Sequence, residues 1–165
     1  MSIERSDVTK VLAGGSLLLG GGTLGLLSQS APAAAATIEV TNENDAGTGS
    51  LRDAIDNSSS GDVITFASNV HSIQLTSGRL EILHSLTLQG PGAANLTIHG
   101  GGAAGRIFYM YNSASMLDIT MSGLTLSDAT ESAIVNWNEN LTLDSVDVTN
   151  NVSNRWGDDA AVIHI

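Results

Sequence analysis

The sequence contains no cysteine, only two prolines and few aromatic residues, which make up 4% of its 165 positions. Without cysteine no disulfide bond can staple the fold, so its stability must come from the stacking of the chain itself. The shortage of aromatic residues, together with 18 glycines, favours an interior of small and β-branched aliphatic side chains joined by tight corners. Hydrophobic residues still make up 42% of the chain, which is the composition of a folded protein of one domain or part of one.

Long apolar runs are also missing, except for one near the N-terminus. Two basic residues precede a Gly- and Leu-rich stretch at 11–27, and an A-x-A sequence follows at 34–36. These features predict that residues 1–36 are a secretory signal peptide and that the mature chain begins near Thr37. An uncleaved membrane anchor is the alternative, but the run is short and leads into an Ala/Pro segment instead of a basic stop-transfer cluster. We therefore expect a secreted or cell-surface protein without a membrane span after cleavage.

Positive charge is scarce. Six Lys and Arg residues stand against 17 Asp and Glu residues, which gives a formal net charge of −11. Cleavage of the first 36 residues leaves this charge unchanged, because they carry two cations and two anions. Such a surface repels nucleic acid and anionic lipid, and it repels a polyanionic polysaccharide unless cations or a local basic patch intervene. The alternative interpretation is that the acidity only keeps the protein soluble outside the cell.

The most informative pattern is a recurrence of short apolar pairs of the form L-x-L or L-x-I. Each pair alternates with period two and most are followed by Gly, Asn, Ser or Asp, which predicts a short β-strand with a turn after it. Strands this short are not stable alone, so their recurrence indicates strands stacked in a solenoid. The six pairs lie in SLTLQG (85–90), NLTIHG (95–100), MLDIT (116–120), GLTLSD (123–128), NLTLDS (140–145) and VDVTNN (146–151).

Together with three further apolar segments at 107–111, 133–137 and 161–165, these strands fall into sets of three. Three strands per turn describe a parallel β-helix, in which each strand pairs with its counterparts in the turns above and below. We therefore expect an all-β fold, with a parallel β-helix of about 4–5 turns over residues 63–165. The alignment places Leu86/Leu88 on Leu117/Ile119 and Leu141/Leu143, Leu96/Ile98 on Leu124/Leu126 and Val146/Val148, and Ile107/Phe108 on Ile134/Val135 and Val162/Ile163.

Residues 37–62 have a different pattern and are expected to form an N-terminal cap. A first strand at 37–40 is followed by a stretch dense in Asn, Asp and Gly at 41–50. Ser50 is a suitable N-cap residue with Asp53 three positions later, so SLRDAIDN predicts one short amphipathic helix. Its apolar face consists of Leu51, Ala54 and Ile55.

The sequence reaches Ile165 within a predicted strand, and no capping helix or polar last turn stands before that residue. We therefore expect this chain to be the N-terminal part of a longer protein. An uncapped last turn leaves strand edges and apolar residues open, so end-to-end association through this turn is a further expectation.

The segment TIEVTNENDAGTGSLRDAIDNSSSGDVITF (37–66) carries the patterns N-x-x-x-x-G-S-L-R-x-A-I and G-D-x-I-x-F. It resembles the N-terminal region of secreted bacterial right-handed parallel β-helix proteins of the pectin-lyase-like superfamily, in the branch with a CSLREA-type domain. Gly49 stands where that branch usually has cysteine. The resemblance implies a right-handed β-helix whose N-terminal end is closed by the helix at 51–55. It also implies that Arg52 and Asp53 are solvated or in local ion pairs, and not catalytic.

An enzyme on this fold would use a groove along one strand face. A polysaccharide lyase needs an Arg or Lys base with carboxylates that hold calcium, and a glycoside hydrolase needs two or three convergent carboxylates. The alignment pairs Asp118 with Thr142 and Asp147 with Thr125, so no carboxylates are aligned, and we predict no catalytic residue. The basic candidates weighed are Arg79, Arg106 and Arg155, and the acidic ones are Asp118, Asp128, Asp144, Asp147, Asp158 and Asp159. Asp158 and Asp159 are adjacent, but the pair is typical of a solvated turn.

No metal or cofactor site is predicted. The four histidines lack the spacing of metal ligands, and no calcium-binding repeat occurs in the sequence. Carboxylates at the corners could bridge calcium, but no motif supports it. The expectation is therefore a protein without a cofactor.

Two tryptophans remain as candidate ligand contacts. Trp137 and Trp156 lie near the third strand of a turn or at the corner before it, and Arg155 is next to Trp156. An exposed tryptophan stacks on sugar rings, whereas a packed tryptophan only fills space. We take Trp137, Trp156 and Arg155 as the candidate glycan contacts, with packing as the alternative.

The leading hypothesis is thus a secreted or cell-surface β-helix scaffold that acts in adhesion, structure or glycan contact without catalysis of its own. Its expected partner is a polysaccharide or a host or cell-surface glycan. The alternative hypothesis is the N-terminal fragment of a polysaccharide lyase or glycoside hydrolase whose catalytic turns lie beyond Ile165.

Overall fold

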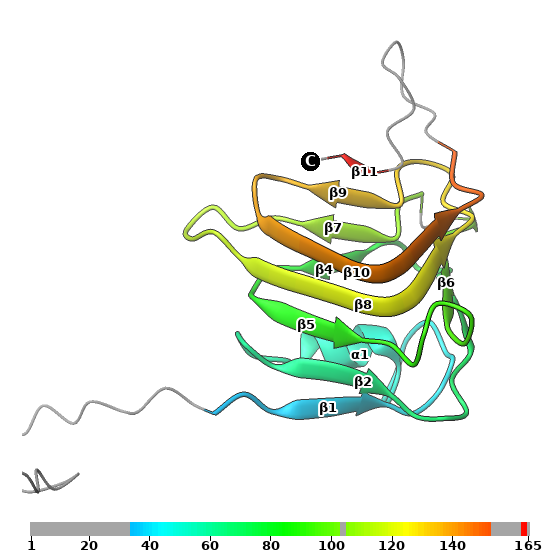
Figure 1. Ribbon diagram of the computed structural model, residues 1–165, viewed down its shortest axis with the longest axis horizontal. Coiled ribbons are helices and arrows are strands. Elements are labelled where there is room, and N and C mark those ends of the chain that lie inside the picture. The colour runs from blue at the N-terminus through cyan, green and yellow to red at the C-terminus, as the bar shows by residue number, and fades with distance from the viewer. Residues whose placement is uncertain (1–33, 103–104, 153–162, 165) are drawn as a thin grey trace, which may run out of the picture. The chain divides into compact units, whose positions relative to one another are not determined.

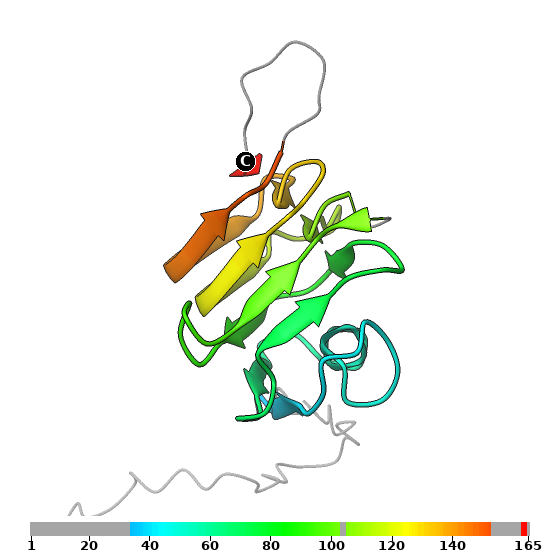
Figure 2. The same cartoon turned by 90° about the vertical axis from the view of Figure 1, so that its right-hand side faces the viewer.

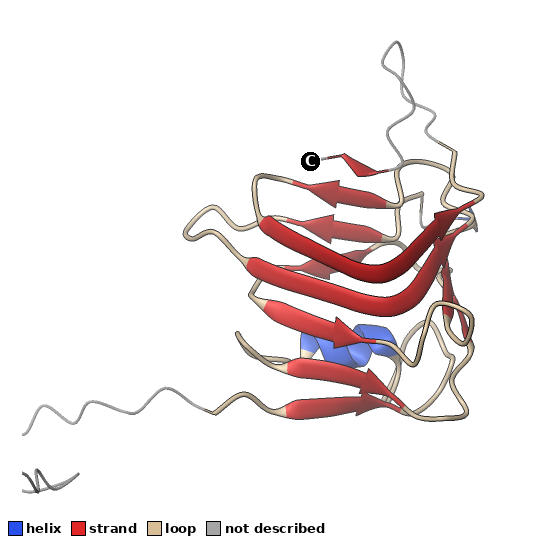
Figure 3. Cartoon of the chain, in the orientation of Figure 1, coloured by secondary structure: helices blue, strands red, loops and turns tan. Residues whose placement is uncertain are grey.

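The computed structural model describes residues 34–102, 105–152 and 163–164. In these residues the chain forms a parallel β-solenoid of about four turns with a single short helix (Figure 1, Figure 3). This confirms the all-β class and the parallel β-helix that the apolar pairs predict. Residues 1–33, most of the predicted signal peptide, lie outside the described part. Among the described residues, no helix is long and apolar enough to cross a membrane.

The strands lie on three stacked faces, and the pairing between turns is parallel. The first face contains β1 (Thr37–Val40), β2 (Val63–Phe66), β5 (Leu86–Gln89) and the first halves of β8 (Asp118–Ser127) and β10 (Asn140–Thr149). The second face contains β3 (Ser72–Gln74), β6 (Thr97–His99) and the second halves of β8 and β10. The third face contains β4 (Leu80–Ile82), β7 (Phe108–Met110), β9 (Ile134–Asn136) and β11 (Ile163–His164).

Two strands differ from the expectation, because β8 and β10 are each one continuous strand of 10 residues. The two apolar pairs within each of them are predicted as separate strands. Instead, both strands curve from the first face into the second, as Figure 1 shows. The bend of β8 contains Gly123 at φ 59° and the bend of β10 contains Ser145 at φ 55°. A single residue in the left-handed region therefore replaces a corner loop.

The strand registers confirm the predicted alignment on the second face and correct it on the first. Ile98 pairs with Leu126, as the alignment predicts. On the first face, however, Ile119 pairs with Leu86, where the alignment predicts Leu117. The same shift of two residues recurs where β10 meets β8 on this face. Alternation cannot detect such a shift, because a move of two residues keeps the same side chains inward.

The third face is shifted by one residue. Phe108 pairs with Ile134, where the alignment predicts Ile107, and Ile163 takes the position predicted for Val162. Ile107 and Phe108 are both buried, so this apolar pair has no alternation from which a register could be derived. This one-residue error in register assigns the wrong partner to every later residue on this face.

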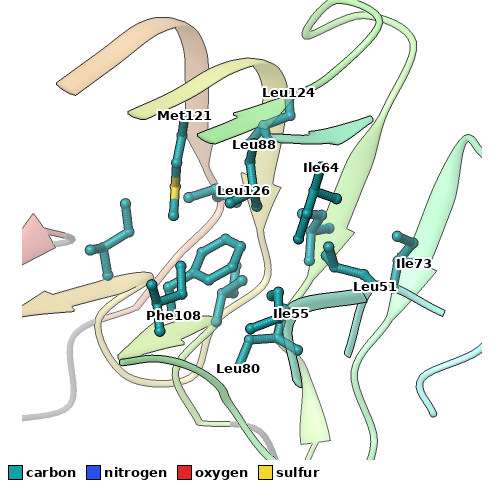
Figure 4. Close-up of a cluster of buried hydrophobic side chains, with 14 of the residues drawn as sticks. Leu51, Ile55, Ile64, Ile73, Leu80, Leu88, Phe108, Met121, Leu124 and Leu126 are labelled. Atoms are coloured by element: carbon teal, nitrogen blue, oxygen red, sulfur yellow. The ribbon is translucent and has the colours of Figure 1, made fainter. Parts of the chain in front are cut away.

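The core is a set of aliphatic columns that run through the stacked turns. Ile64, Leu88 and Met121 occupy paired positions on the first face, and all three are fully buried. In Figure 4 their side chains lie in one cluster with Phe108 from the third face. Burial of one such side chain stabilises the fold by about 1.5–3 kcal/mol. Stacked apolar columns therefore supply the stability that disulfide bonds cannot.

The helix α1 (Leu51–Asp56) begins after Ser50, as the capping pattern predicts. The Ser50 hydroxyl oxygen accepts a hydrogen bond from the Asp53 amide at 3.1 Å, and the Asp53 carboxylate accepts one from the Gly49 amide at 2.9 Å. The apolar residues of the helix join the core and contact β1 and β4 at the N-terminal end of the stack (Figure 2). The predicted short helix is therefore confirmed, and its apolar residues are buried against the first turn.

Arg52 links the helix to two loops. Its guanidinium donates hydrogen bonds to the Asp45 carboxylate at 2.9 Å and to the carbonyl oxygens of Gly78 and Arg79 at 2.7 and 2.8 Å. Asp45 lies in the loop before the helix, and Gly78 lies in the next turn of the solenoid. Arg52 is therefore in a local ion pair, and its role is to hold the cap on the stack.

Asp45 is held in its ionised form by its surroundings. Burial raises the pKa of this carboxyl, but hydrogen bonds from Ser77, Arg52 and Thr76 outweigh burial and hold the pKa well below its usual range. The carboxylate accepts from the Ser77 amide at 2.8 Å and from the Thr76 hydroxyl at 3.0 Å. One side chain thus ties the loop before the helix to the corner of the next turn.

Two further carboxylates hold neighbouring turns together. Glu43 accepts hydrogen bonds from the amides of His71 and Ser72, which lower the pKa of Glu43. Asp62 accepts a hydrogen bond from the Ala36 amide, which lowers the pKa of Asp62. Each of these contacts joins residues about one turn apart in the sequence. Part of the acidity of the chain therefore has a structural role.

We expect Asp45→Asn to lower the free energy of unfolding at pH 7 by about 2–3 kcal/mol, because the charge-assisted hydrogen bonds are lost. The folded-state pKa of Asp45 lies below the unfolded value of about 3.9. Its contribution is therefore present above about pH 4 and is lost as the pH falls further. Urea unfolding of variant and parent at pH 7 and pH 3 measures both effects. The control is Glu39→Gln on β1, and equal stability of the two variants would contradict this role for Asp45.

The corner between the first and second faces brings two backbones together at Gly90 and Gly123. The Gly90 amide donates to the Ser122 carbonyl oxygen and the Gly92 amide to the Gly123 carbonyl oxygen, both at 2.8 Å. A Cβ atom on Gly90 would overlap the Gly123 carbonyl oxygen. Glycine is required there because the clash is with backbone that the stacked turns hold in place.

We expect Gly90→Ala to lower the free energy of unfolding by about 2–4 kcal/mol, because the added methyl group forces the two corners apart. Gly101→Ala is the matched control, since a Cβ there meets its nearest neighbour at an ordinary 3.6 Å. The midpoint of urea unfolding at unchanged slope measures the difference. Similar midpoints for the two variants would show that the corner adapts.

β10 is the last strand of the first and second faces in the described chain. Its four inward apolar residues are half-buried, whereas their partners on β8 are buried. They are Leu141, Leu143, Val146 and Val148. Asp144 and Asp147 add like charges along this strand, which oppose pairing between two copies. End-to-end association through this end and further turns beyond Ile165 stay predictions.

Candidate functional site

Three large exposed side chains follow successive strands of the third face at equivalent positions. Leu83 follows β4, Tyr111 follows β7 and Trp137 follows β9, and they are 51%, 45% and 52% exposed. The residues before them, at the ends of these strands, are paired in register. We call Leu83, Tyr111 and Trp137 the apolar column.

The backbone ladder extends through the apolar column. The Tyr111 amide donates to the Ile82 carbonyl oxygen at 3.3 Å, and the Trp137 amide donates to the Met110 carbonyl oxygen at 3.1 Å. Neighbouring members of the column are therefore one turn apart, which is about 4.8 Å. Ile82 and Met110 are fully buried, so the alternation of the strand directs the next side chain outward.

A buried carboxylate braces the turns that carry the apolar column. Glu139 is 7% exposed, and its carboxylate accepts hydrogen bonds from the Asn112 amide at 2.7 Å and the Leu117 amide at 2.6 Å. The Asn136 side chain donates to the Glu139 carbonyl oxygen at 2.8 Å and accepts from the Glu139 amide at 3.0 Å. These bonds close the turn on which Trp137 sits.

The brace reaches the other two members of the apolar column. Asn112 directly follows Tyr111, and its side-chain amide donates to the Leu83 carbonyl oxygen at 3.0 Å. Glu139, Asn136 and Asn112 thus join three successive turns through side-chain to backbone hydrogen bonds. The column is therefore presented on a preformed surface.

We expect Glu139→Gln to lower the free energy of unfolding by about 1–3 kcal/mol, because the Asn112 or the Leu117 amide loses its acceptor. The amides of Asn112 and Leu117 should then exchange hydrogen faster with solvent, which nuclear magnetic resonance measures residue by residue. Glu39→Gln again serves as the exposed control. Unchanged protection of both amides in Glu139→Gln would contradict the brace.

A polar cleft of ≈ 410 Å³ lies where the strands of the third face begin, whereas the apolar column lies where these strands end. Among its lining residues, Arg79 and Glu81 form an ion pair at 2.8 Å, and Arg106 and Glu131 form a second at 2.6 Å. The cleft is lined by Ser77, Gly78, Arg79, Glu81, Gly105, Arg106 and Glu131. We call it the ionic cleft, and its two guanidinium groups are each balanced by a carboxylate.

The ionic cleft and the apolar column share the outward side of the third face. The Arg79 guanidinium lies 4.1 Å from the centre of the Tyr109 ring, a cation–π contact. Glu81 and Tyr109 are paired across β4 and β7. Leu83 lies two residues after Glu81, and Tyr111 lies two residues after Tyr109. Because side chains alternate along a strand, Leu83 and Tyr111 point to the same side as Glu81 and Tyr109 and extend the same surface.

The candidates for catalysis are not assembled in the described residues. Arg79 and Arg106, the basic candidates, are each in an ion pair with a glutamate. Asp118 pairs with Asn140, which corrects the predicted pairing with Thr142, and Asp147 pairs with Thr125 as predicted. Within the described strands, no carboxylate is paired with a carboxylate on the neighbouring turn.

Two histidine contacts have the elements of acid–base chemistry. His99 Nδ1 lies 2.6 Å from the Asp128 carboxylate, and hydrogen bonds from His99 and then Ser127 lower the pKa of Asp128. Ser58 Oγ lies 2.8 Å from His84 Nε2, but the Ser58 hydroxyl donates to the carbonyl oxygen of Ile55 at 2.7 Å. Ser58 therefore accepts from His84 and is not activated as a nucleophile. In the residues that the structure describes, no three potential ligand side chains gather to hold a metal ion.

The predicted glycan contacts fall in different parts of the chain. Trp137 is exposed on the third face, while Arg155 and Trp156 lie outside the described residues. Sequence reasoning missed Tyr111, because the one-residue shift on this face placed Met110 opposite Trp137. The sequence does contain a signal for Tyr111: a large aromatic residue directly follows the end of β7, just as Trp137 directly follows the end of β9.

No protein-family model, no curated protein and no solved structure matches this chain. The assignment of the fold as a parallel β-solenoid therefore rests on the strand pairing in the structure. We therefore infer function from the side chains that the turns bring together.

Proposed function

We propose that this chain is a secreted or cell-surface β-helix module that binds glycans on its third face and does no catalysis of its own. The finer classification is part of the proposal: a right-handed β-helix of the pectin-lyase-like superfamily with a CSLREA-type N-terminal region. The observation that carries the proposal is the apolar column, with two exposed aromatic side chains on successive turns. The signal-peptide pattern of residues 1–36 supports secretion.

Aromatic side chains on successive turns suit a sugar chain. Tyrosine and tryptophan each combine a large apolar ring with one polar group, so they can cover the C–H face of a sugar and hydrogen bond to a hydroxyl. The three positions of the apolar column extend over about 10 Å along the stack. A glycan laid parallel to the solenoid axis would therefore meet Leu83, Tyr111 and Trp137 in order.

The ionic cleft supports the same proposal, since binding sites combine an apolar lining with a few placed polar groups. Its guanidinium groups donate hydrogen bonds and its carboxylates accept them, and a sugar hydroxyl can do both. The brace around Glu139 adds preorganisation, which reduces the entropy lost when a ligand binds. Glycan contact is thus compatible with a scaffold role, because a stacked solenoid presents its lateral faces as an extended surface.

We expect Tyr111→Ala and Trp137→Ala each to weaken glycan binding by about tenfold, the effect typical of an aromatic contact residue. Affinity electrophoresis in gels that contain cellulose derivatives, xylan, mannan or pectin identifies a retained glycan, and titration calorimetry measures its affinity. The matched control is Met116→Ala, because Met116 is 58% exposed and lies outside the apolar column.

Two results would overturn the proposal. One is the failure of every glycan in the panel to retard the parent protein. The other is retardation that Tyr111→Ala and Trp137→Ala leave unchanged. Recovery of a bound oligosaccharide at its original length after prolonged incubation tests the absence of catalysis, and shortened products would contradict that part.

A further inference from the structure

The charge of the third face depends on the two ion pairs of the ionic cleft. In the part of the chain that the structure describes, the arginines are Arg52, Arg79 and Arg106. Arg52 is used at the junction of cap and stack, where it pairs with Asp45. Arg79 and Arg106 therefore are the guanidinium groups placed to meet a ligand on the third face.

Each of these two guanidinium groups already has a carboxylate partner. Arg79 reaches Glu81 through Nε at 3.1 Å and through its terminal nitrogen at 2.8 Å, and it also stacks on Tyr109. Arg106 reaches Glu131 at 2.6 Å. The Glu81 and Glu131 side chains are 50% and 48% exposed, against 36% and 26% for Arg79 and Arg106, so each carboxylate is the more exposed member of its pair.

This arrangement discriminates between acidic and uncharged glycans. A uronate carboxylate binds best to a free guanidinium in a forked pair of hydrogen bonds. On the third face it would have to compete with Glu81 or Glu131 for the guanidinium donors, in a chain with a formal net charge of −11. A neutral sugar displaces no charge, because its hydroxyl groups add hydrogen bonds to the existing pairs.

We propose that Glu81 and Glu131 are specificity residues that make the third face select uncharged glycans over uronate-containing ones. This rests on the proposed glycan-binding function and adds the chemical class of the ligand. The glutamates act through Arg79 and Arg106: they occupy the positions that the carboxylates of an acidic glycan would take.

The test compares the double variant Glu81→Gln/Glu131→Gln with the parent protein. Titration calorimetry uses cellohexaose, xylohexaose, mannohexaose and hexagalacturonate as ligands. We expect the parent to prefer a neutral hexasaccharide, and the double variant to bind hexagalacturonate about tenfold more tightly than the parent because two guanidinium groups are freed. Affinity for the neutral ligand should change by less than about threefold, and 1 M salt should remove the gain for hexagalacturonate.

The matched control is Glu39→Gln/Asp147→Asn, which changes the net charge by the same amount on the first and second faces. If this control gains affinity for hexagalacturonate equally, the effect belongs to net charge and the proposal is overturned. Preference of the parent for hexagalacturonate over the neutral ligands would also overturn it, while leaving glycan binding in place. Absence of binding to all four ligands would remove both proposals. Equal melting temperatures of parent and both variants confirm that the fold is intact.

Discussion

Parallel pairing of each strand with its counterpart one turn away is the constraint on which the rest of this structure depends. It fixes the neighbour of a side chain as the residue one turn later, at a spacing of about 4.8 Å. Inward positions such as Ile64, Leu88 and Met121 are therefore apolar together. The buried Asn136, which pairs with Met110, is stable at an inward position because its side chain hydrogen bonds to the Glu139 backbone. The same pairing aligns outward residues without further cost, and this is how Tyr111 and Trp137 come to share one surface.

Strands of three or four residues leave much of each turn without ladder hydrogen bonds, so the corners need their own connections. This chain has no cysteine and makes them with carboxylates and amides. Asp45, Glu43 and Glu139 each accept amide hydrogen bonds from a turn other than their own. The buried carboxylate of Glu139 is stable there because two amide donors replace the water it loses. The acidity of the sequence is thus in part a substitute for covalent cross-links.

Most of the fold could be predicted from the sequence, because period-two alternation and a capping residue are local signals. The bounds of β1 and the start of the helix at Leu51 follow from them. Register could not be predicted, since a shift of two residues preserves every inward side chain and the pair Ile107–Phe108 does not alternate. The partners of Glu139 were also beyond prediction, because they lie 22 and 27 residues away and no local pattern marks an acceptor for a distant amide.

The carboxylate–arginine ion pairs of this chain differ in burial, and their contributions to folding differ with it. Asp45 is 12% exposed and its pairing with Arg52 is part of a network of backbone contacts, so its loss leaves unsatisfied buried groups. Glu81 and Glu131 are about half exposed, and a solvated ion pair contributes only about 0–1 kcal/mol to folding. Residues at such positions are therefore weakly constrained by stability. Because they still set the charge on the third face, they are the positions at which the preference of the proposed glycan site would change while the stacked turns beneath it stay the same.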